Sequence, residues 1–281
     1  MIAVGRRPLL TAENLALMAQ ALRDGAARCS CSLDLGLTVS EVGVAAAGFA
    51  CGDAQYPWPD ALKDRTIYYW TGTGFEPAAT YVGSLIKLVP TQWGAPTFEI
   101  DGIKMLPSAS LSPFEDARRK VELVGVRRRR VLDTCGGLGY FAAWCQRLGA
   151  RQVLSCEKNP QVLWLRELNP WSPRPNAVLE VLNVAVERHI TTLADASIDV
   201  ILHDPPRFGI AGELYARTFY QQLARVLRPG GTLFHYTGSP NSLSSGRDLA
   251  GEVLRRLQQC GFKARRALDG VLGRSILKPV R

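Results

Sequence analysis

Four polar side chains stand where short apolar runs of the sequence end. Asp133 closes RRVLD, Glu157 closes QVLSCE, Asn183 follows AVLEVL, and Asp204 closes SIDVILHD. Apolar runs of this length, separated by amphipathic segments, are typical of buried parallel strands joined by helices. The carboxyl ends of such strands meet at one edge of a sheet, where ligands bind in this class of fold. These four side chains are therefore candidates for a shared binding site.

The first run leads directly into a glycine-rich turn, Asp133-Thr-Cys-Gly-Gly-Leu-Gly139, and then into a predicted helix. Glycines at a strand-to-helix turn let a ligand approach the backbone where no Cβ intrudes. Asp133, Cys135, Gly137 and Gly139 are the candidate cofactor-binding positions of this turn. The same turn would also suit a dinucleotide, whose pyrophosphate would bind at the helix N-terminus.

Glu157 lies 18 residues after Gly139, a spacing typical of an acid that binds ribose hydroxyls. A carboxylate has two acceptor oxygens and can bind both hydroxyls of a vicinal diol. Asn183 could accept a hydrogen bond through its carbonyl oxygen or donate one from its amide, and it could equally be a turn residue.

The fourth run ends in Asp204-Pro205-Pro206-Arg207-Phe208. Two consecutive prolines fix φ and remove two donors, which predicts that a loop with free carbonyls leaves the sheet here. Asp204, Pro205, Pro206 and Phe208 are the candidate catalytic residues, and Asp204 also borders the predicted cofactor site.

Three further residues, His203, Tyr215 and Tyr236, are weaker candidates for contact with substrate. His203 precedes Asp204 and so points to the opposite face of the strand. A packed, hydrogen-bonded histidine is therefore favoured over a catalytic base at this position.

Around these residues, the sequence predicts an α/β protein in two parts. Residues 1–110 contain an amphipathic helix over Leu10–Ala26, with Thr11 as a possible N-cap, followed by short strands separated by Gly, Pro and Asp. A connector helix is expected over 111–125. Residues 126–281 alternate strands and helices and close with a strand, a turn and a strand, which predicts a mostly parallel seven-stranded sheet with one late antiparallel strand.

The composition, 47% apolar and 21% charged, is that of a soluble globular protein, and the sequence has no apolar run long enough to span a membrane. We expect a cytoplasmic protein with no membrane partner; its oligomeric state cannot be predicted. The seven cysteines and three histidines lack paired metal-ligand spacing, so no metal site is expected.

The net charge of +9 is uneven, −2 over residues 1–125 and +11 over 126–281. This asymmetry favours an anionic partner such as RNA or, equally, a solvated arginine-rich surface.

The segments VLDTCGGLGYFA, SCEKNP, HDPPRFGIAGELY and PTQWGAPTFEIDGIKM resemble the archaeal-type predicted methyltransferases. The resemblance implies the class I methyltransferase (Rossmann-like) fold with a smaller β-rich N-terminal domain. It also implies S-adenosyl-L-methionine as cofactor and S-adenosylhomocysteine as product. Methyltransferases of this class have D-x-G-x-G-x-G at the first turn, so Cys135 replaces the usual first glycine. Amino-group methyltransferases place an aromatic residue directly after the prolines, whereas here Arg207 precedes Phe208.

The resemblance leaves the acceptor open, either an RNA base or a small molecule bearing nitrogen. A second reading comes from GELYARTFYQQLARVLRPGG, which is similar to the aminopropyltransferases of the spermidine synthase type. Those enzymes normally have an acid where this chain has Leu138, and an acidic pair where it has prolines. A third reading is a non-catalytic RNA-binding protein with the same fold.

Overall fold

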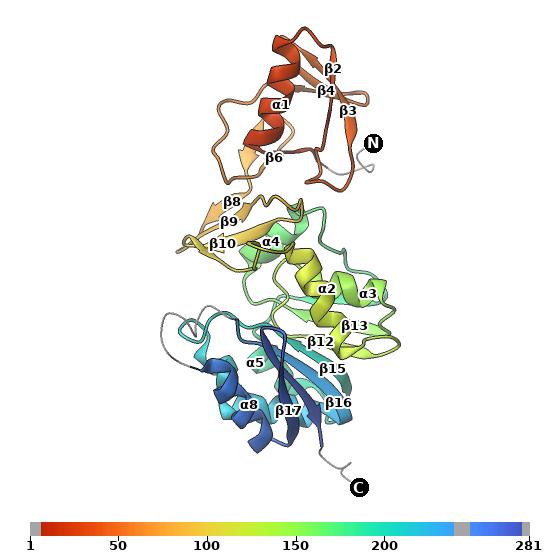
Figure 1. Ribbon diagram of the computed structural model, residues 1–281, viewed down its shortest axis with the longest axis vertical. Coiled ribbons are helices and arrows are strands. Elements are labelled where there is room, and N and C mark those ends of the chain that lie inside the picture. The colour runs from red at the N-terminus through yellow and green to blue at the C-terminus, as the bar shows by residue number, and fades with distance from the viewer. Residues whose placement is uncertain (1–6, 239–247, 277–281) are drawn as a thin grey trace. The chain divides into compact units, whose positions relative to one another are not determined.

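The computed structural model describes residues 7–238 and 248–276, which fold into two compact units (Figure 1). The first unit comprises Met1–Asp116 and Trp164–Ser172, and the second comprises Ala117–Leu163 and Pro173–Arg281. The segment Trp164–Ser172 was assigned by sequence order to residues 126–281. Its place in the first unit follows from Trp171, whose indole N–H donates to the Leu35 carbonyl at 3.0 Å and whose ring contacts Phe114 edge-on.

The first unit contains the predicted N-terminal helix, α1 (Ala12–Arg23). Thr11 is its N-cap: the Thr11 hydroxyl accepts from the Asn14 amide, and the Asn14 side chain accepts from the Thr11 amide. This reciprocal capping box satisfies two amides that a helix end would otherwise leave unpaired.

Short strands make up most of the rest of the first unit, as predicted. In its described residues they form three small antiparallel sheets: β1 (Leu9–Leu10), β6 (Tyr68–Trp70) and β7 (Phe75–Pro77); β2 (Arg28–Cys31), β3 (Ser40–Ala45), β4 (Gly48–Cys51) and β5 (Ala54–Pro57); and β8 (Ala79–Tyr81), β9 (Leu85–Val89), β10 (Thr97–Ile100) and β11 (Ile103–Lys104).

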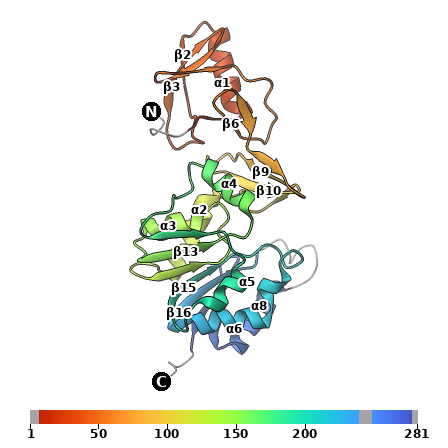
Figure 2. The same cartoon turned by 180° about the vertical axis from the view of Figure 1, so that it is seen from behind.

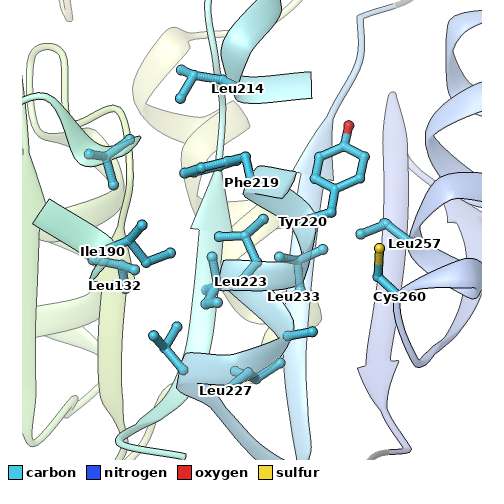
Figure 3. Close-up of a cluster of buried hydrophobic side chains, with 14 of the residues drawn as sticks. Leu132, Ile190, Leu214, Phe219, Tyr220, Leu223, Leu227, Leu233, Leu257 and Cys260 are labelled. Atoms are coloured by element: carbon cyan, nitrogen blue, oxygen red, sulfur yellow. The ribbon is translucent and has the colours of Figure 1, made fainter. Parts of the chain in front are cut away.

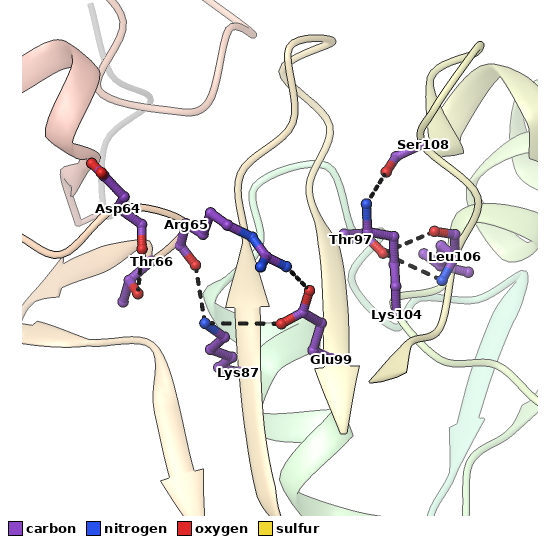
Figure 4. Close-up of polar contacts among 9 residues, drawn as sticks. All are labelled: Asp64, Arg65, Thr66, Lys87, Thr97, Glu99, Lys104, Leu106 and Ser108. Carbon is purple, nitrogen blue, oxygen red and sulfur yellow. Dashed lines mark hydrogen bonds and ion pairs between the residues drawn. The ribbon is translucent and has the colours of Figure 1, made fainter. Parts of the chain in front are cut away.

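One buried carboxylate links the third of these sheets to the chain that precedes it. Glu99 on β10 is 3% exposed, and its side chain forms ion pairs with Arg65 and, at 3.9 Å, with Lys87 on β9 (Figure 4). The Lys87 ammonium also donates to the Arg65 carbonyl at 3.3 Å. A buried charge is tolerated only where it is paired in this way, so Glu99 fixes the position of the Arg65 segment.

The second unit is built on a seven-stranded sheet in the order β14-β13-β12-β15-β16-β18-β17 (Figure 1). Its strands are β12 (Arg130–Asp133), β13 (Gln152–Cys156), β14 (Leu179–Leu182), β15 (Ile198–His203), β16 (Leu227–Tyr236), β17 (Phe262–Ala267) and β18 (Gly270–Ser275). The strands from β14 to β16 are parallel, and β18 runs antiparallel between β16 and β17. The predicted late antiparallel strand is therefore confirmed.

Helices cover both faces of this sheet. The predicted connector helix is α2 (Pro113–Val124), and α3 (Tyr140–Arg147) and α4 (Pro160–Leu168) follow β12 and β13. The opposite face carries α5 (Val186–His189), α6 (Arg217–Val226) and α8 (Leu249–Gln259) (Figure 2), with the 3₁₀ turns η1 (Ile190–Thr192) and η2 (Gly212–Tyr215). Apolar side chains from α6, α8 and the sheet form one buried cluster beneath these helices (Figure 3).

The run ELYARTFYQQLARVL predicts one long helix over 213–227, but the structure divides it, so this prediction is wrong. Ala216 is extended, with φ −71° and ψ 147°, and separates η2 from α6. The Tyr215 carbonyl accepts a hydrogen bond from the Arg256 guanidinium on α8 at 2.8 Å instead of one from a helical amide. A contact with a distant residue therefore interrupts a locally helical sequence.

We predict that Glu99→Ala lowers the free energy of unfolding by about 1–3 kcal/mol, because it leaves two cations without their shared acceptor. Urea denaturation would measure the change. Asp60→Ala removes an exposed acid of the same unit and should change stability much less. Equal effects of the two substitutions would show that Glu99 has no special structural role.

Candidate functional site

The predicted convergence of polar residues occurs in the second unit. In the parallel register, Asp133 pairs with Ser155 on one side and Leu202 on the other, while Cys156 pairs with Leu182. Glu157, Asn183 and Asp204, each of which follows its strand, therefore lie at the same edge of the sheet as the turn after Asp133. The sequence reasoning placed this edge correctly because it depends only on strand direction.

The turn after β12 requires its glycines. Gly137 and Gly139 have φ of 49° and 79°, in the left-handed region that favours glycine. Cys135 is not in that region, so a residue with a side chain fits where methyltransferases of this class usually have their first glycine. The Gly136 amide donates to the Cys156 carbonyl at 2.7 Å, and Leu138 is 1% exposed. The turn is thus fixed to β13 and to the core, and of its three glycines Gly137 is the one that is partly exposed.

Glu157 accepts two hydrogen bonds from the backbone. Its Oε2 accepts from the Gly137 amide at 3.0 Å, and its Oε1 accepts from the Asn159 amide at 2.9 Å. In a dinucleotide site, amides of this turn would bind the pyrophosphate. Here a carboxylate already accepts from the Gly137 amide and would repel a phosphate, so the geometry disfavours the dinucleotide interpretation.

Asn183 is exposed, and its orientation is fixed by its amide group. The Nδ2 atom donates to the carbonyls of Glu157 and Lys158, at 2.9 and 3.1 Å. Its amide protons are therefore engaged, and the carbonyl oxygen is the group that Asn183 can offer to a ligand. The sequence left donor and acceptor roles open, whereas the structure favours acceptance.

Asp133 and Cys135 were candidates for contact with a cofactor, but Asp133 is buried and Cys135 carries no charge. Asp133 is 1% exposed, and its Oδ2 accepts from the Ser155 hydroxyl at 2.8 Å, which places it beneath the site. Burial, followed by the nearby Glu157 carboxylate, raises the pKa of the Cys135 thiol well above its ordinary value. Cys135 therefore stays a neutral thiol rather than a nucleophilic thiolate.

The Asp-Pro-Pro loop is held from one side by an aromatic pair. Asp204 and Pro206 are half-buried, and the Tyr215 hydroxyl donates to the Pro206 carbonyl at 3.1 Å. The ring of Phe208 packs edge-on against Tyr215, with centroids 5.4 Å apart. Burial, followed by the Asp204 carboxylate, raises the pKa of Tyr215, so this phenol remains a donor to the loop.

His203 lies within the core, as its strand position predicted, and does not reach the site. It is fully buried, with Nδ1 2.7 Å from the Thr134 hydroxyl and Nε2 3.2 Å from the Leu214 carbonyl. The weaker expectation that His203 contacts substrate is therefore corrected. Its ring packs edge-on against that of His235, with centroids 4.4 Å apart, and His235 Nε2 lies 2.9 Å from the Tyr220 hydroxyl. The sequence did not reveal this pairing.

Tyr236, the other weak candidate, is half-buried at the end of β16. The ammonium of the buried Lys120 on α2 lies 3.8 Å from the centroid of its ring. This cation–π contact accounts for the position of Tyr236 without a substrate.

Two negative findings apply to residues 7–238 and 248–276. No group of three or more His, Cys, Asp or Glu side chains there could hold a metal ion. No helix in the same ranges has the length and apolar character needed to cross a membrane.

Comparison with known proteins gives one close sequence relative. No family model matches the chain. The uncharacterized protein MJ1233 of Methanocaldococcus jannaschii is 43% identical over 241 residues, covering 83% of this chain and 81% of that protein.

Comparison with solved structures identifies the fold. A spermidine synthase in complex with the transition-state analogue AdoDATO aligns with a TM-score of 0.54 and 17% identity, over 65% of this chain and 64% of that chain, which is less than two thirds of its length. The spermidine synthase of Thermotoga maritima aligns with a TM-score of 0.53 and 15% identity, over 70% and 71%. MNMC2 from Aquifex aeolicus aligns with a TM-score of 0.51 and 19% identity, over 71% and 72%. The predicted class I methyltransferase and spermidine synthase fold is confirmed.

We predict that the buried histidine pair makes stability fall at acidic pH. Burial, followed by the neighbouring His235, lowers the pKa of His203 well below its ordinary value, and burial lowers the pKa of His235 to about 4. Histidines of the unfolded chain bind protons near pH ~6.5. As the pH falls from about 6.5 to about 4, the unfolded state gains protons that the folded state does not bind, so each histidine costs up to ~1.4 kcal/mol per pH unit.

Urea denaturation of the wild type, His235→Asn and the control His189→Asn between neutral and acidic pH would measure this loss. As the pH falls, the free energy of unfolding of the wild type and of the control should decrease equally steeply. That of His235→Asn should decrease less steeply. Three parallel curves would contradict a role for the pair in acid sensitivity.

Proposed function

This chain belongs to the family of the uncharacterized protein MJ1233 of Methanocaldococcus jannaschii, and we propose that it transfers a methyl group from S-adenosyl-L-methionine to a nitrogen-bearing acceptor. The observation that carries the proposal is the meeting of the Asp204-Pro205-Pro206 loop with the glycine turn and Glu157 at one edge of a class I sheet.

The site fits this cofactor because it offers acceptors where the cofactor has donors. The cofactor has a ribose diol, an adenine amino group and a positively charged sulfonium. Glu157 would bind the diol, since each carboxylate oxygen has further lone pairs beyond its backbone bond. The carbonyl of Asn183 would accept from the adenine amine, and Gly137, which is partly exposed and has no Cβ, would let the ligand approach the turn. The carboxylates of Glu157 and Asp204 favour a cation.

When bound, the cofactor supplies a methyl group already activated by the sulfonium, so alignment of the acceptor provides much of the acceleration. Asp204 would accept a hydrogen bond from the acceptor amine and receive the proton that the amine loses as the new N–C bond forms. The Pro205 carbonyl, and the second lone pair of the Pro206 carbonyl, would orient the remaining N–H group. Phe208, held by Tyr215, would form one wall of the acceptor site.

A second candidate, aminopropyl transfer, is favoured by the likeness of the fold to spermidine synthases. Decarboxylated S-adenosylmethionine would occupy the same cleft. The Asp-Pro-Pro loop favours methyl transfer because it presents carbonyl acceptors where the aminopropyltransferases normally have an acidic pair. The mass of the modified product separates the two reactions.

We predict that S-adenosylhomocysteine binds with micromolar affinity, about −8 kcal/mol, in isothermal titration calorimetry. Glu157→Gln keeps the size of the side chain but removes its charge and one acceptor, and should cost about 1.5–3 kcal/mol of binding free energy. Glu180→Gln makes the same change of charge at an exposed position on β14 and should bind like wild type. Absence of binding heat for the wild type at millimolar ligand would contradict the cofactor assignment.

We also predict that Asp204 is required for transfer but not for cofactor binding. Purified protein would be incubated with methyl-labelled S-adenosylmethionine and, separately, with transfer RNA and with a mixture of small amines. Asp204→Ala should reduce labelling by about 10²-fold or more while S-adenosylhomocysteine still binds. Asp204→Asn keeps an acceptor but cannot take a proton, so it separates positioning from base catalysis. Normal labelling by both variants would remove Asp204 from the active site.

A further inference from the structure

The last two strands of the sheet present basic side chains on the face opposite α8. Phe262 and Ala264 on β17 belong to the buried cluster beneath α8, and Arg266 forms an ion pair with Asp248 at the N-cap of that helix. Side chains alternate along a strand, so Lys263 and Arg265 point to the other face.

Arg274 on β18 joins them. Val271 on the same strand packs in the cluster beneath α8, which places Arg274 on the opposite face by alternation. In the antiparallel register, Lys263 lies directly opposite Arg274, and Arg265 lies opposite Leu272. Side chains directly opposite have Cβ atoms ~5 Å apart and diagonal neighbours ~7–8 Å apart. Lys263, Arg265 and Arg274, here named the basic face, therefore form one compact group of cations.

The basic face is exposed and lacks counter-charges in the described part of the chain. All three residues are exposed, and none forms an ion pair with a described acidic residue. Some exposed arginines of the second unit do have acidic partners, such as Arg228 with Asp199 at 2.8 Å. In Figure 1, α2 and α3 lie over the β12 and β13 side of the sheet, and the described helix that packs against β17 is α8, on the face opposite the three cations.

The clustering of three cations lowers the stability of the fold, which suggests that the basic face has a function. Like charges directly opposite each other on neighbouring strands repel. Charged residues on an edge strand can prevent sheets from pairing edge to edge, and this would explain Lys263 and Arg265 on β17. It does not explain Arg274, because β18 is paired on both sides, with β16 and β17.

The basic face also lies away from the carboxylates of the candidate site. Arg274 pairs across β18 and β16 with Thr232, whereas the carboxyl end of β16 is at Tyr236. Four residues of strand, ~13 Å, separate Arg274 from that end. Arg265 lies opposite Leu272, which lies opposite Phe234, so two residues of strand, ~7 Å, separate its level from the same end. Phosphates would be repelled by Glu157 and Asp204, so a nucleic-acid acceptor needs an anchoring surface at some distance from the site. A folded RNA is large enough to contact the basic face while one of its bases lies at the candidate site.

We propose that Lys263, Arg265 and Arg274 bind the phosphate backbone of an RNA. The choice of RNA rests on the proposed function, in which an RNA base is one of the possible acceptors, while binding itself requires no transfer. Several cations spread over a flat sheet suit a chain of phosphates better than a single anion, which needs a concave site. Each phosphate neutralised by the basic face releases counterions, so binding must weaken as salt rises.

The test is fluorescence anisotropy with labelled transfer RNA, measured in the absence of cofactor over a range of salt concentrations. The variant replaces Lys263, Arg265 and Arg274 with glutamine. Its control replaces Arg188, Arg217 and Arg255 with glutamine, three exposed arginines on the helices of the opposite face. The basic-face variant should bind at least tenfold more weakly, and its slope of log K against log salt should be smaller by about 2–3, at 0.7–0.9 for each lost phosphate contact. The control should keep both the affinity and the slope of the wild type.

A second measurement, the melting temperature, tests whether the three cations are kept for RNA binding or are only a solvated surface. Arg274→Thr removes the repulsion with Lys263 and should raise the melting temperature while weakening RNA binding. An unchanged affinity of the basic-face variant, or an equal loss in the control, would overturn the proposal. Binding of wild type to vesicles of anionic lipid but not to transfer RNA would also overturn it.

The two proposals can fail separately. Binding of S-adenosylhomocysteine without RNA binding would remove the basic face and leave the methyl-transfer proposal in place, with a small-molecule acceptor. RNA binding through the basic face by a protein that does not bind S-adenosylhomocysteine would do the reverse.

Discussion

The hydrogen bond between the Gly137 amide and the Glu157 carboxylate connects the turn after β12 to the end of β13. The turn can form only because Gly137 and Gly139 adopt left-handed backbone conformations, and it keeps its position because Glu157 holds it. Asn183 in turn holds the backbone at Glu157 from the end of β14. Three neighbouring strands are thus joined at their carboxyl ends by short contacts, and the acceptors that would bind a cofactor are parts of those same contacts.

The loop after β15 depends on a second set of contacts, which comes from inside the core. Tyr215 holds the Pro206 carbonyl and supports the ring of Phe208. Beneath it, the rings of His203 and His235 pack together, and Tyr220 binds His235. Burial keeps both histidines neutral, which lets two ionisable groups occupy the core beside the candidate site. Core side chains therefore hold the loop after β15, as Glu157 holds the turn after β12.

Charge is divided between two surfaces of the second unit. The candidate site contains carboxylates, which suit a cationic cofactor and a neutral amine. The basic face on β17 and β18 contains cations without described acidic partners, which suit phosphates. Under the two proposals, a cationic cofactor and a polyanion would bind at separate surfaces of one unit.

The sequence by itself determined the order of strands and helices in residues 126–281, the late antiparallel strand, and the edge where Glu157, Asn183 and Asp204 meet. These features follow from hydrophobic period, glycine and proline placement and strand direction, all of which are local properties. Burial of His203 was also predictable, because alternation along a strand fixes the face of each side chain.

Only the tertiary structure decided the remaining features. It placed Trp171 with Leu35 in the first unit, ended η2 at Tyr215 through Arg256, fixed the orientation of the Asn183 amide, paired His203 with His235, and set Lys263 opposite Arg274. Each of these depends on a contact between residues distant in the sequence. No local pattern encodes such a contact, because its free energy exists only once the intervening chain has folded.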